Sequence, residues 1–192
     1  MNNDTRNEIA LKLSAMHFNS LSNNDFSKIL GLDLIKIFYT ILLNEKYGKV
    51  FYETNENGDI ISICCGFHRY REFKKKYFRT TLFKIIVKFL TGGLPISRTI
   101  NELFADLPTA VKKHNDTALG FIGSSTEFGI RGPLSLASNY YKTIKYLRDE
   151  NCSYVWGSTL TGNVNAIQFL SRNNFKIIGE NINGKNYYIL KL

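Results

Sequence analysis

Residues 127–133, with the sequence EFGIRGP, have the composition of a turn that binds an anion. They lie between a short apolar run, 118–123, that predicts a strand and a helical pattern that starts near Pro133. Gly129 and Gly132 let the main chain approach a ligand, and the backbone N–H groups at a helix start suit phosphate oxygens. Arg131 adds a positive charge. The segment is a candidate pyrophosphate site, with an ordinary strand-to-helix turn as the alternative interpretation.

A second candidate is Asn163, which follows the predicted strand Tyr154–Leu160. It starts an amphipathic helix over 163–173, and Asn is among the best residues for capping a helix N-terminus. Asn174 can close that helix because Asn tolerates the left-handed conformation. The apolar face of the helix predicts core positions at Ala166, Ile167 and Leu170.

The elements that must position these residues form a mixed α/β pattern, and residues 1–192 are expected to fold as one domain. Asn57-Gly58 between apolar runs is a strong hairpin signal because both residues accept positive φ. Helices are predicted at 5–18, from 26 or 33 to 44, and at 78–89, 97–106 and 133–150. Strands are predicted at 49–53, 60–67, 118–123, 154–160, 175–180 and 186–190.

Residues 161–175, TGNVNAIQFLSRNNF, resemble the cofactor-holding segment of the GNAT superfamily of acyl-CoA-dependent N-acyltransferases. The resemblance covers residues 118–192 well and the first half only loosely. It implies a GNAT-like α/β (α+β) fold with one mixed sheet of about six to seven strands, helices on both faces and a basic helical insertion. It also implies that two neighbouring parallel strands diverge and that the pantetheine arm of the cofactor lies between them, much like an added strand.

The resemblance implies that acetyl-CoA, or another acyl-CoA, is the cofactor. Backbone groups of the strand near 121–124 would bind the pantetheine arm, and Asn163 would touch it. The loop would hold the pyrophosphate, and its register against the family pattern Q/R-x-x-G-x-G/A stays open, with Arg131 or Gly129 as the lead residue. The implied cofactor-binding residues are Phe121, Ile122, Gly123, Ser124, Gly129, Ile130, Arg131, Gly132, Pro133, Leu134 and Asn163.

The implied activity is transfer of an acetyl or other short acyl group to an amine of a small molecule, for example an amino sugar or a cell-surface precursor. The family often uses a Tyr on the C-terminal helix as general acid, and this chain has Leu170 there. His17, beside the expected acceptor loop, is a candidate catalytic residue, although a lone His is more often structural. The spacing of His, Cys and acidic residues predicts no metal site.

A basic segment, residues 69–88, carries eight Lys or Arg against the single acid Glu72, a local net charge of +7. The charges interleave with four aromatic residues, Tyr70, Phe73, Tyr77 and Phe78. The alternative function is a catalytically inactive GNAT-like module that binds anionic membrane or nucleic acid through this segment. A solvated helix face is the plainer interpretation. Membrane or a phosphorylated acceptor is favoured over nucleic acid, because no recognition motif accompanies the charges.

The expected location is the cytoplasm, with peripheral contact at the inner face of the membrane as a further expectation. Three cysteines, Cys64, Cys65 and Cys152, are expected to be reduced and mostly buried. No signal-peptide pattern is visible, and the most apolar run, 82–90, is interrupted by Lys84 and Lys88.

Overall fold

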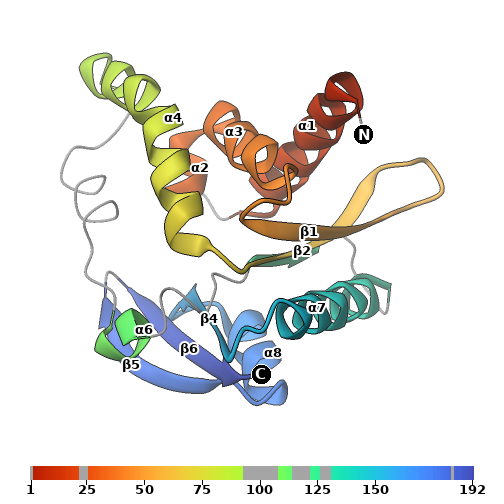
Figure 1. Ribbon diagram of the computed structural model, residues 1–192, viewed down its shortest axis with the longest axis vertical. Coiled ribbons are helices and arrows are strands. Elements are labelled where there is room, and N and C mark those ends of the chain that lie inside the picture. The colour runs from red at the N-terminus through yellow and green to blue at the C-terminus, as the bar shows by residue number, and fades with distance from the viewer. Residues whose placement is uncertain (1, 22–25, 93–107, 114–121, 126–130, 183) are drawn as a thin grey trace.

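The computed structural model describes residues 2–21, 26–92, 108–113, 122–125, 131–182 and 184–192 (Figure 1). The N-terminal part is helical, with α1 at Asn3–Ser20, α2 at Phe26–Leu30 and α3 at Leu32–Leu42. The helix predicted to start at 26 or 33 is therefore two helices. Gly31 separates them because its φ of 92° lies outside the conformation that continues an α-helix.

The first sheet contains three antiparallel strands in the order β1-β2-β3. The predicted hairpin is confirmed, with β1 at Gly48–Thr54, β2 at Ile60–Phe67 and Gly58 at φ 78° in the turn. Strand β3, Ile122–Ser125, pairs with the first half of β2. Two described helices lie between β2 and β3 in the sequence, α4 at Tyr70–Leu90 and α6 at Thr109–Lys113.

The second sheet also contains three antiparallel strands, in the order β4-β6-β5. Strand β4, Tyr154–Leu160, has the predicted bounds, and β5 and β6 span Lys176–Ile182 and Lys185–Lys191. Helix α7, Arg131–Asp149, precedes β4, and α8, Val164–Arg172, joins β4 to β5. One mixed sheet is therefore wrong for the described residues, because β3 takes β2 as its partner and β4 takes β6.

Helices cover both faces of the first sheet, as predicted: α1 and α3 lie on one face and α7 on the other (Figure 1). Helix α7 approaches β2 closely at Gly66, where an added Cβ would lie 2.8 Å from Cγ2 of Thr143. Tyr140 on α7 also contacts Phe169 and Phe175, edge to face and tilted respectively. One apolar cluster therefore joins both sheets through α7.

Helix α4 confirms that the basic segment is helical, and its status as an insertion stays a prediction. Its buried side chains Phe73, Thr81 and Ile85 face the α3 side of the domain. The helix predicted at 97–106 and the first part of the strand predicted at 118–123 lie outside the described residues. Among the helices that the structure describes, none combines the length and apolar character needed to cross a membrane.

Candidate functional site

The start of α7 is the candidate anion site. Strand β3 ends at Ser125 and α7 begins at Arg131, two residues before the predicted start at Pro133. Arg131 and Gly132 therefore lie in the first helical turn and not in the loop before it, and Pro133 lies in that turn as the sequence predicts. The first N–H groups of an α-helix have no acceptor within the helix, and the helix dipole makes this end positive. Leu134 follows with an exposed side chain. The predicted loop residues Gly129 and Ile130 lie outside the described residues.

Strand β3 is the candidate site for an extended cofactor arm. It pairs with β2 from Ile122, opposite Cys65, to Ser125, opposite Ser62. No described residue of β3 pairs with β4, so these strands are edges of two different sheets. An edge strand presents N–H and C=O groups that an extended ligand can pair with. The described part of the predicted arm site is therefore Ile122, Gly123 and Ser124, and Phe121 lies outside it.

Asn163 caps α8. Its side-chain oxygen accepts a hydrogen bond of 3.1 Å from the N–H of Ala166, and the side chain is exposed. The cap explains why a helix starts directly after β4. Asn174, after the helix, has φ 62°, which confirms the predicted left-handed closure. Contact between Asn163 and a cofactor stays a prediction.

Leu170 lies in the core, where its side chain is 5% exposed. Its burial confirms the predicted core role, and a carbon side chain there cannot donate a proton. The sequence alone does not single out Tyr188 as a general acid that could replace the missing Tyr at position 170. Only the folded structure distinguishes Tyr188 from the other tyrosines. Its hydroxyl is buried on β6 without a hydrogen-bond partner among the described residues. Its backbone lies opposite Gly157 of β4.

A buried polar cluster lies under the N-terminal half of α7. Nδ2 of Asn139 donates a 2.8 Å hydrogen bond to Oγ of Ser62, which also shares a short hydrogen bond with Oγ of Ser135. Among the described residues, Oδ1 of Asn139 has no hydrogen-bond partner. Thr143 donates from its hydroxyl to the carbonyl of Asn139. Sequence periodicity places these residues on one helix face but does not predict that polar groups pair there.

Glu53, at the edge of this cluster, is held as a carboxylate. Burial alone would raise its pKa, but hydrogen bonds from Ser135, Ser138 and Lys142 outweigh that effect and lower the pKa. The Nζ of Lys142 lies 3.3 Å from Oε1 of Glu53. A paired carboxylate with a lowered pKa is a weak base, so Glu53 is better suited to holding α7 against β1 than to accepting a proton.

His17 lies where α1 packs against α3. The side chain is 7% exposed, and its Nδ1 shares a 3.0 Å hydrogen bond with the hydroxyl of Tyr39. Burial raises the pKa of Tyr39 well above its usual value. The tyrosine is therefore neutral and can donate to the ring. These contacts describe a buried, partnered histidine, and its catalytic role stays a prediction.

A second histidine, His68, lies beside the C-terminal end of α7, at the opposite end of the helix from Arg131. Nδ1 of His68 lies 2.6 Å from the hydroxyl of Tyr146, and its Nε2 lies 4.0 Å from Oε2 of Glu150. Burial lowers the pKa of His68, and the nearby Glu150 only partly opposes this. Helix α7 rises about 1.5 Å per residue, so the group is remote from Arg131. Of the residues that the structure describes, none form a cluster of three or more side chains suited to a metal ion.

The sequence matches no family model, and no curated protein matches it significantly. Solved structures do match. A GNAT-family acetyltransferase from Staphylococcus aureus Mu50 gives a TM-score of 0.54 at 13% identity, over 100% of this chain and 96% of that chain. Ribosomal-protein-alanine N-acetyltransferase from Brucella melitensis gives 0.57 at 9% identity, over 97% and 96% of the two chains.

A third match is a Salmonella typhimurium protein, assigned as an acetyltransferase, whose structure includes its cofactor acetyl-CoA; it gives a TM-score of 0.56 at 8% identity, over 97% of this chain and 90% of that chain. The chain has the GNAT fold. Within that fold, β3 followed by α7, and β4 followed by Asn163 and α8, are the elements on which the sequence resemblance rests. At these identities the likeness establishes the fold, and the substrate must be inferred from this chain's own residues.

Proposed function

We propose that this protein is an acyl-CoA-dependent N-acetyltransferase that acts on an amine of a small molecule, such as an amino sugar or a cell-surface precursor. The observation that carries the proposal is the edge of β3, which no described residue of β4 covers, followed by a helix that starts with Arg131 and Gly132. In a GNAT fold this is a backbone surface for an extended ligand beside an end suited to phosphate.

Acetyl-CoA would supply the activated acetyl group as a thioester. The donors present suit it: the α7 N-terminus would hold the pyrophosphate, backbone groups of Ile122, Gly123 and Ser124 would orient the arm, and Asn163 would lie beside it. An acyl chain longer than acetyl is compatible with the same backbone contacts. The acceptor amine must lose a proton to become nucleophilic, and His17 is the candidate base carried over from the sequence.

Calorimetric titration with acetyl-CoA tests the proposal. Saturable binding is expected. If millimolar acetyl-CoA produces no heat of binding, the proposed function is wrong. A sharper test is Gly132→Glu, which places a negative charge in the first turn of α7. A negative charge at a helix N-terminus interacts favourably with the helix dipole, so the variant should keep the thermal stability of the parent protein. The same charge repels the pyrophosphate, so the affinity for the cofactor should fall at least tenfold.

Asn3→Glu is the matched control, because it adds the same charge to the exposed first residue of α1. It should leave cofactor binding unchanged within about twofold, which is the effect expected of a screened charge on a separate helix. Equal losses in both variants would show that net charge, and not the start of α7, determines binding.

A catalytically inactive GNAT-like module is the second candidate function, and the buried Leu170 favours it. The two functions are separated by following thiol release from acetyl-CoA over a panel of small amines and amino sugars. Cofactor binding together with amine-dependent thiol release supports the enzyme. Cofactor binding without release for any amine supports the inactive module.

A further inference from the structure

Helix α4 carries nine exposed side chains that divide along its length into a basic half and an apolar half. The basic half consists of Lys74, Lys75, Lys76 and Arg79, which are all exposed and have no acidic partner among the described residues. The apolar half, in the last three turns, consists of five exposed side chains, Leu82, Phe83, Ile86, Val87 and Leu90. We call these nine residues the outward face of α4.

Folding separates this face from two other cations of the basic segment, Lys84 and Lys88. Nζ of Lys88 lies 2.9 Å from Asp33 on α3 and also donates to the carbonyl of Leu30. Nζ of Lys84 lies 3.8 Å from the same carboxylate. These two lysines therefore fasten α4 to α3. Asp33 partly neutralises their charges, which leaves the remaining positive charge of α4 concentrated in its N-terminal half.

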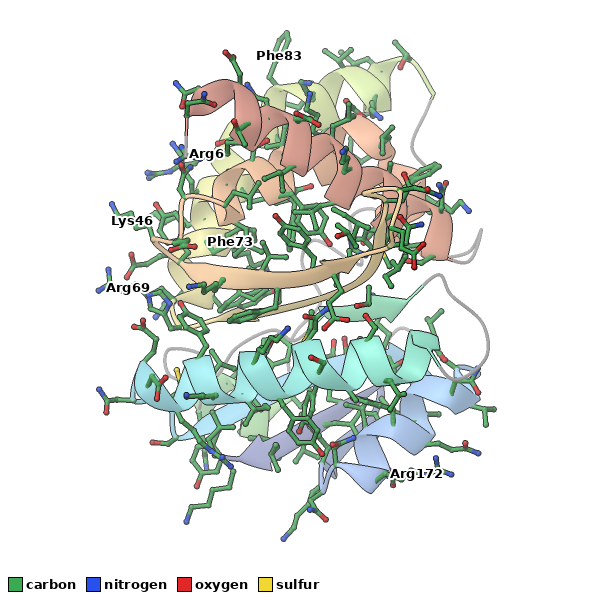
Figure 2. The ribbon with its side chains drawn as sticks, turned by 90° about the vertical axis from the view of Figure 1, so that its right-hand side faces the viewer. Arg6, Lys46, Arg69, Phe73, Phe83 and Arg172 are labelled. Carbon is green, nitrogen blue, oxygen red and sulfur yellow. The ribbon has the colours of Figure 1, made fainter. Side chains whose placement is uncertain are left out.

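The apolar half is unusual for an exposed surface. Phe83 is 76% exposed and Leu90 is 82% exposed, and five of the twelve exposed large apolar side chains of the described residues lie within 82–90. Single exposed apolar residues are ordinary, but a contiguous group marks an interaction surface. Figure 2 shows Phe83 at the extremity of the molecule, pointing away from the domain.

We propose that the outward face of α4 docks the protein on an anionic membrane surface, with Phe83, Val87 and Leu90 among the acyl chains and the four cations at the headgroups. Exposed apolar side chains next to exposed cations bind a membrane interface through buried apolar area together with attraction to anionic lipid. The charge complementarity favours lipid over a second copy of the chain, whose own basic half would be repelled.

The same arrangement disfavours nucleic acid. A polyanion would pair with Lys74, Lys75 and Lys76, but it offers nothing to bury Phe83 and Leu90. Lipid satisfies both halves of the face at once. The inference stands independently of acyl transfer, because it uses no residue of β3, α7 or α8.

Co-sedimentation with phosphatidylcholine vesicles, with and without about 30% phosphatidylglycerol, tests the docking. The protein should bind the anionic vesicles and not the neutral ones. The triple variant Lys74→Glu, Lys75→Glu, Lys76→Glu should weaken binding at least about fiftyfold, since each cation near such a surface contributes roughly fivefold. The double variant Phe83→Ser, Leu90→Ser should weaken it at least tenfold.

Matched controls exist on the far side of the molecule. Lys145→Glu, Arg172→Glu, Lys176→Glu makes the same change in net charge at exposed sites, and Figure 2 shows Arg172 at the opposite end from Phe83. Tyr141→Ser, Ile177→Ser removes two exposed apolar side chains elsewhere. Both controls should bind vesicles much more tightly than the α4 variants do.

Insertion has a direct readout as well. Phe83→Trp should show a blue-shifted emission and quenching by brominated lipid on anionic vesicles, and Tyr141→Trp should show neither. Absence of binding to anionic vesicles would overturn the proposal, and so would equal losses in the α4 variants and their controls. Self-association that disappears in Phe83→Ser, Leu90→Ser, without vesicle binding, would instead make the face a contact between two copies. Binding to an oligonucleotide that depends on the three lysines but not on Phe83 would also overturn it.

Discussion

The side-chain amide of Asn139, on α7, donates a 2.8 Å hydrogen bond to the hydroxyl oxygen of Ser62, on β2, and both residues are fully buried. Strand β3 pairs with β2, and Ser125 of β3 lies opposite Ser62 of β2. The hydrogen bond therefore connects the helix whose start is the candidate anion site to the strand beside the candidate arm site. The hydrogen bond therefore helps to fix the candidate anion site relative to the candidate arm site.

Replacing Ser62 with Ala should lower the free energy of unfolding by about 1–3 kcal/mol, because the amide of Asn139 loses its main acceptor inside the protein. Urea denaturation measures the change. The double variant Ser62→Ala, Asn139→Leu removes both partners and should recover part of the loss. A Ser62→Ala protein as stable as the parent would show that the hydrogen bond contributes little.

Gly66→Ala should destabilise the protein by about 1–3 kcal/mol, because the new methyl group overlaps Thr143 and Leu147 and pushes α7 away from β2. Gly162→Ala is the control, since nothing lies within 4 Å of the added Cβ and its φ is not left-handed. Thermal or urea unfolding of both variants makes the comparison. Similar stability in the two would contradict the close packing of α7.

Asn163→Ala should lower the free energy of unfolding by about 1 kcal/mol through loss of the cap on α8, and Asn163→Ser should retain most of it. Acetyl-CoA titration of the same two variants separates the two proposed roles of Asn163. A serine variant that keeps its stability but loses affinity would support contact with the cofactor. Parallel changes in stability and affinity would assign Asn163 to capping alone.

Tyr188→Phe should leave the stability unchanged or raise it by up to about 1 kcal/mol, because the hydroxyl is buried without a partner among the described residues. Urea unfolding tests this expectation. A clear loss of stability would mean that the hydroxyl has a partner in the folded protein. If the variant also releases thiol more slowly while binding acetyl-CoA normally, Tyr188 becomes the candidate acid that Leu170 cannot be.

The free energy of unfolding should decrease as the pH is lowered below about 6.5, which is the pKa of His68 in the unfolded chain. His68 has a folded-state pKa below that value, chiefly because it is buried, so the unfolded chain binds the proton more strongly. The stabilisation is complete above the unfolded pKa and is lost as pH falls toward the folded pKa. His68→Gln should flatten this dependence in unfolding measurements between about pH 5 and pH 8, the range in which His titrates. An unchanged slope would exclude His68 as its source.

Local signals in the sequence were sufficient for much of the fold. The strand Tyr154–Leu160 has the predicted bounds, and Asn163 and Asn174 start and close the next helix as expected. Each depends on the periodicity, capping or φ preference of a few neighbouring residues. The anion-site prediction also uses only local signals, a turn followed by a helix start, and it stays a prediction.

The pairing of distant residues required the tertiary structure. Residues 69–88 carry eight basic residues that the sequence does not distinguish. Only the packing of α4 on α3 assigns Lys84 and Lys88 to Asp33 and leaves the other face outward. The prediction of one mixed sheet was wrong for the described residues, because strand partnership depends on contacts between segments far apart in the chain.

Sequence by itself determined the element types, their order and the polar residues at their ends, since these follow from interactions within a few residues. Tertiary structure decided that Leu170 is enclosed. Within the part of the chain that the structure describes, it also decided that β3 and β4 belong to different sheets and that the buried hydroxyl of Tyr188 has no hydrogen-bond partner. Burial and partnership are properties of the whole packed chain. A residue's neighbours in space, and with them its chemistry, exist only once the chain has folded.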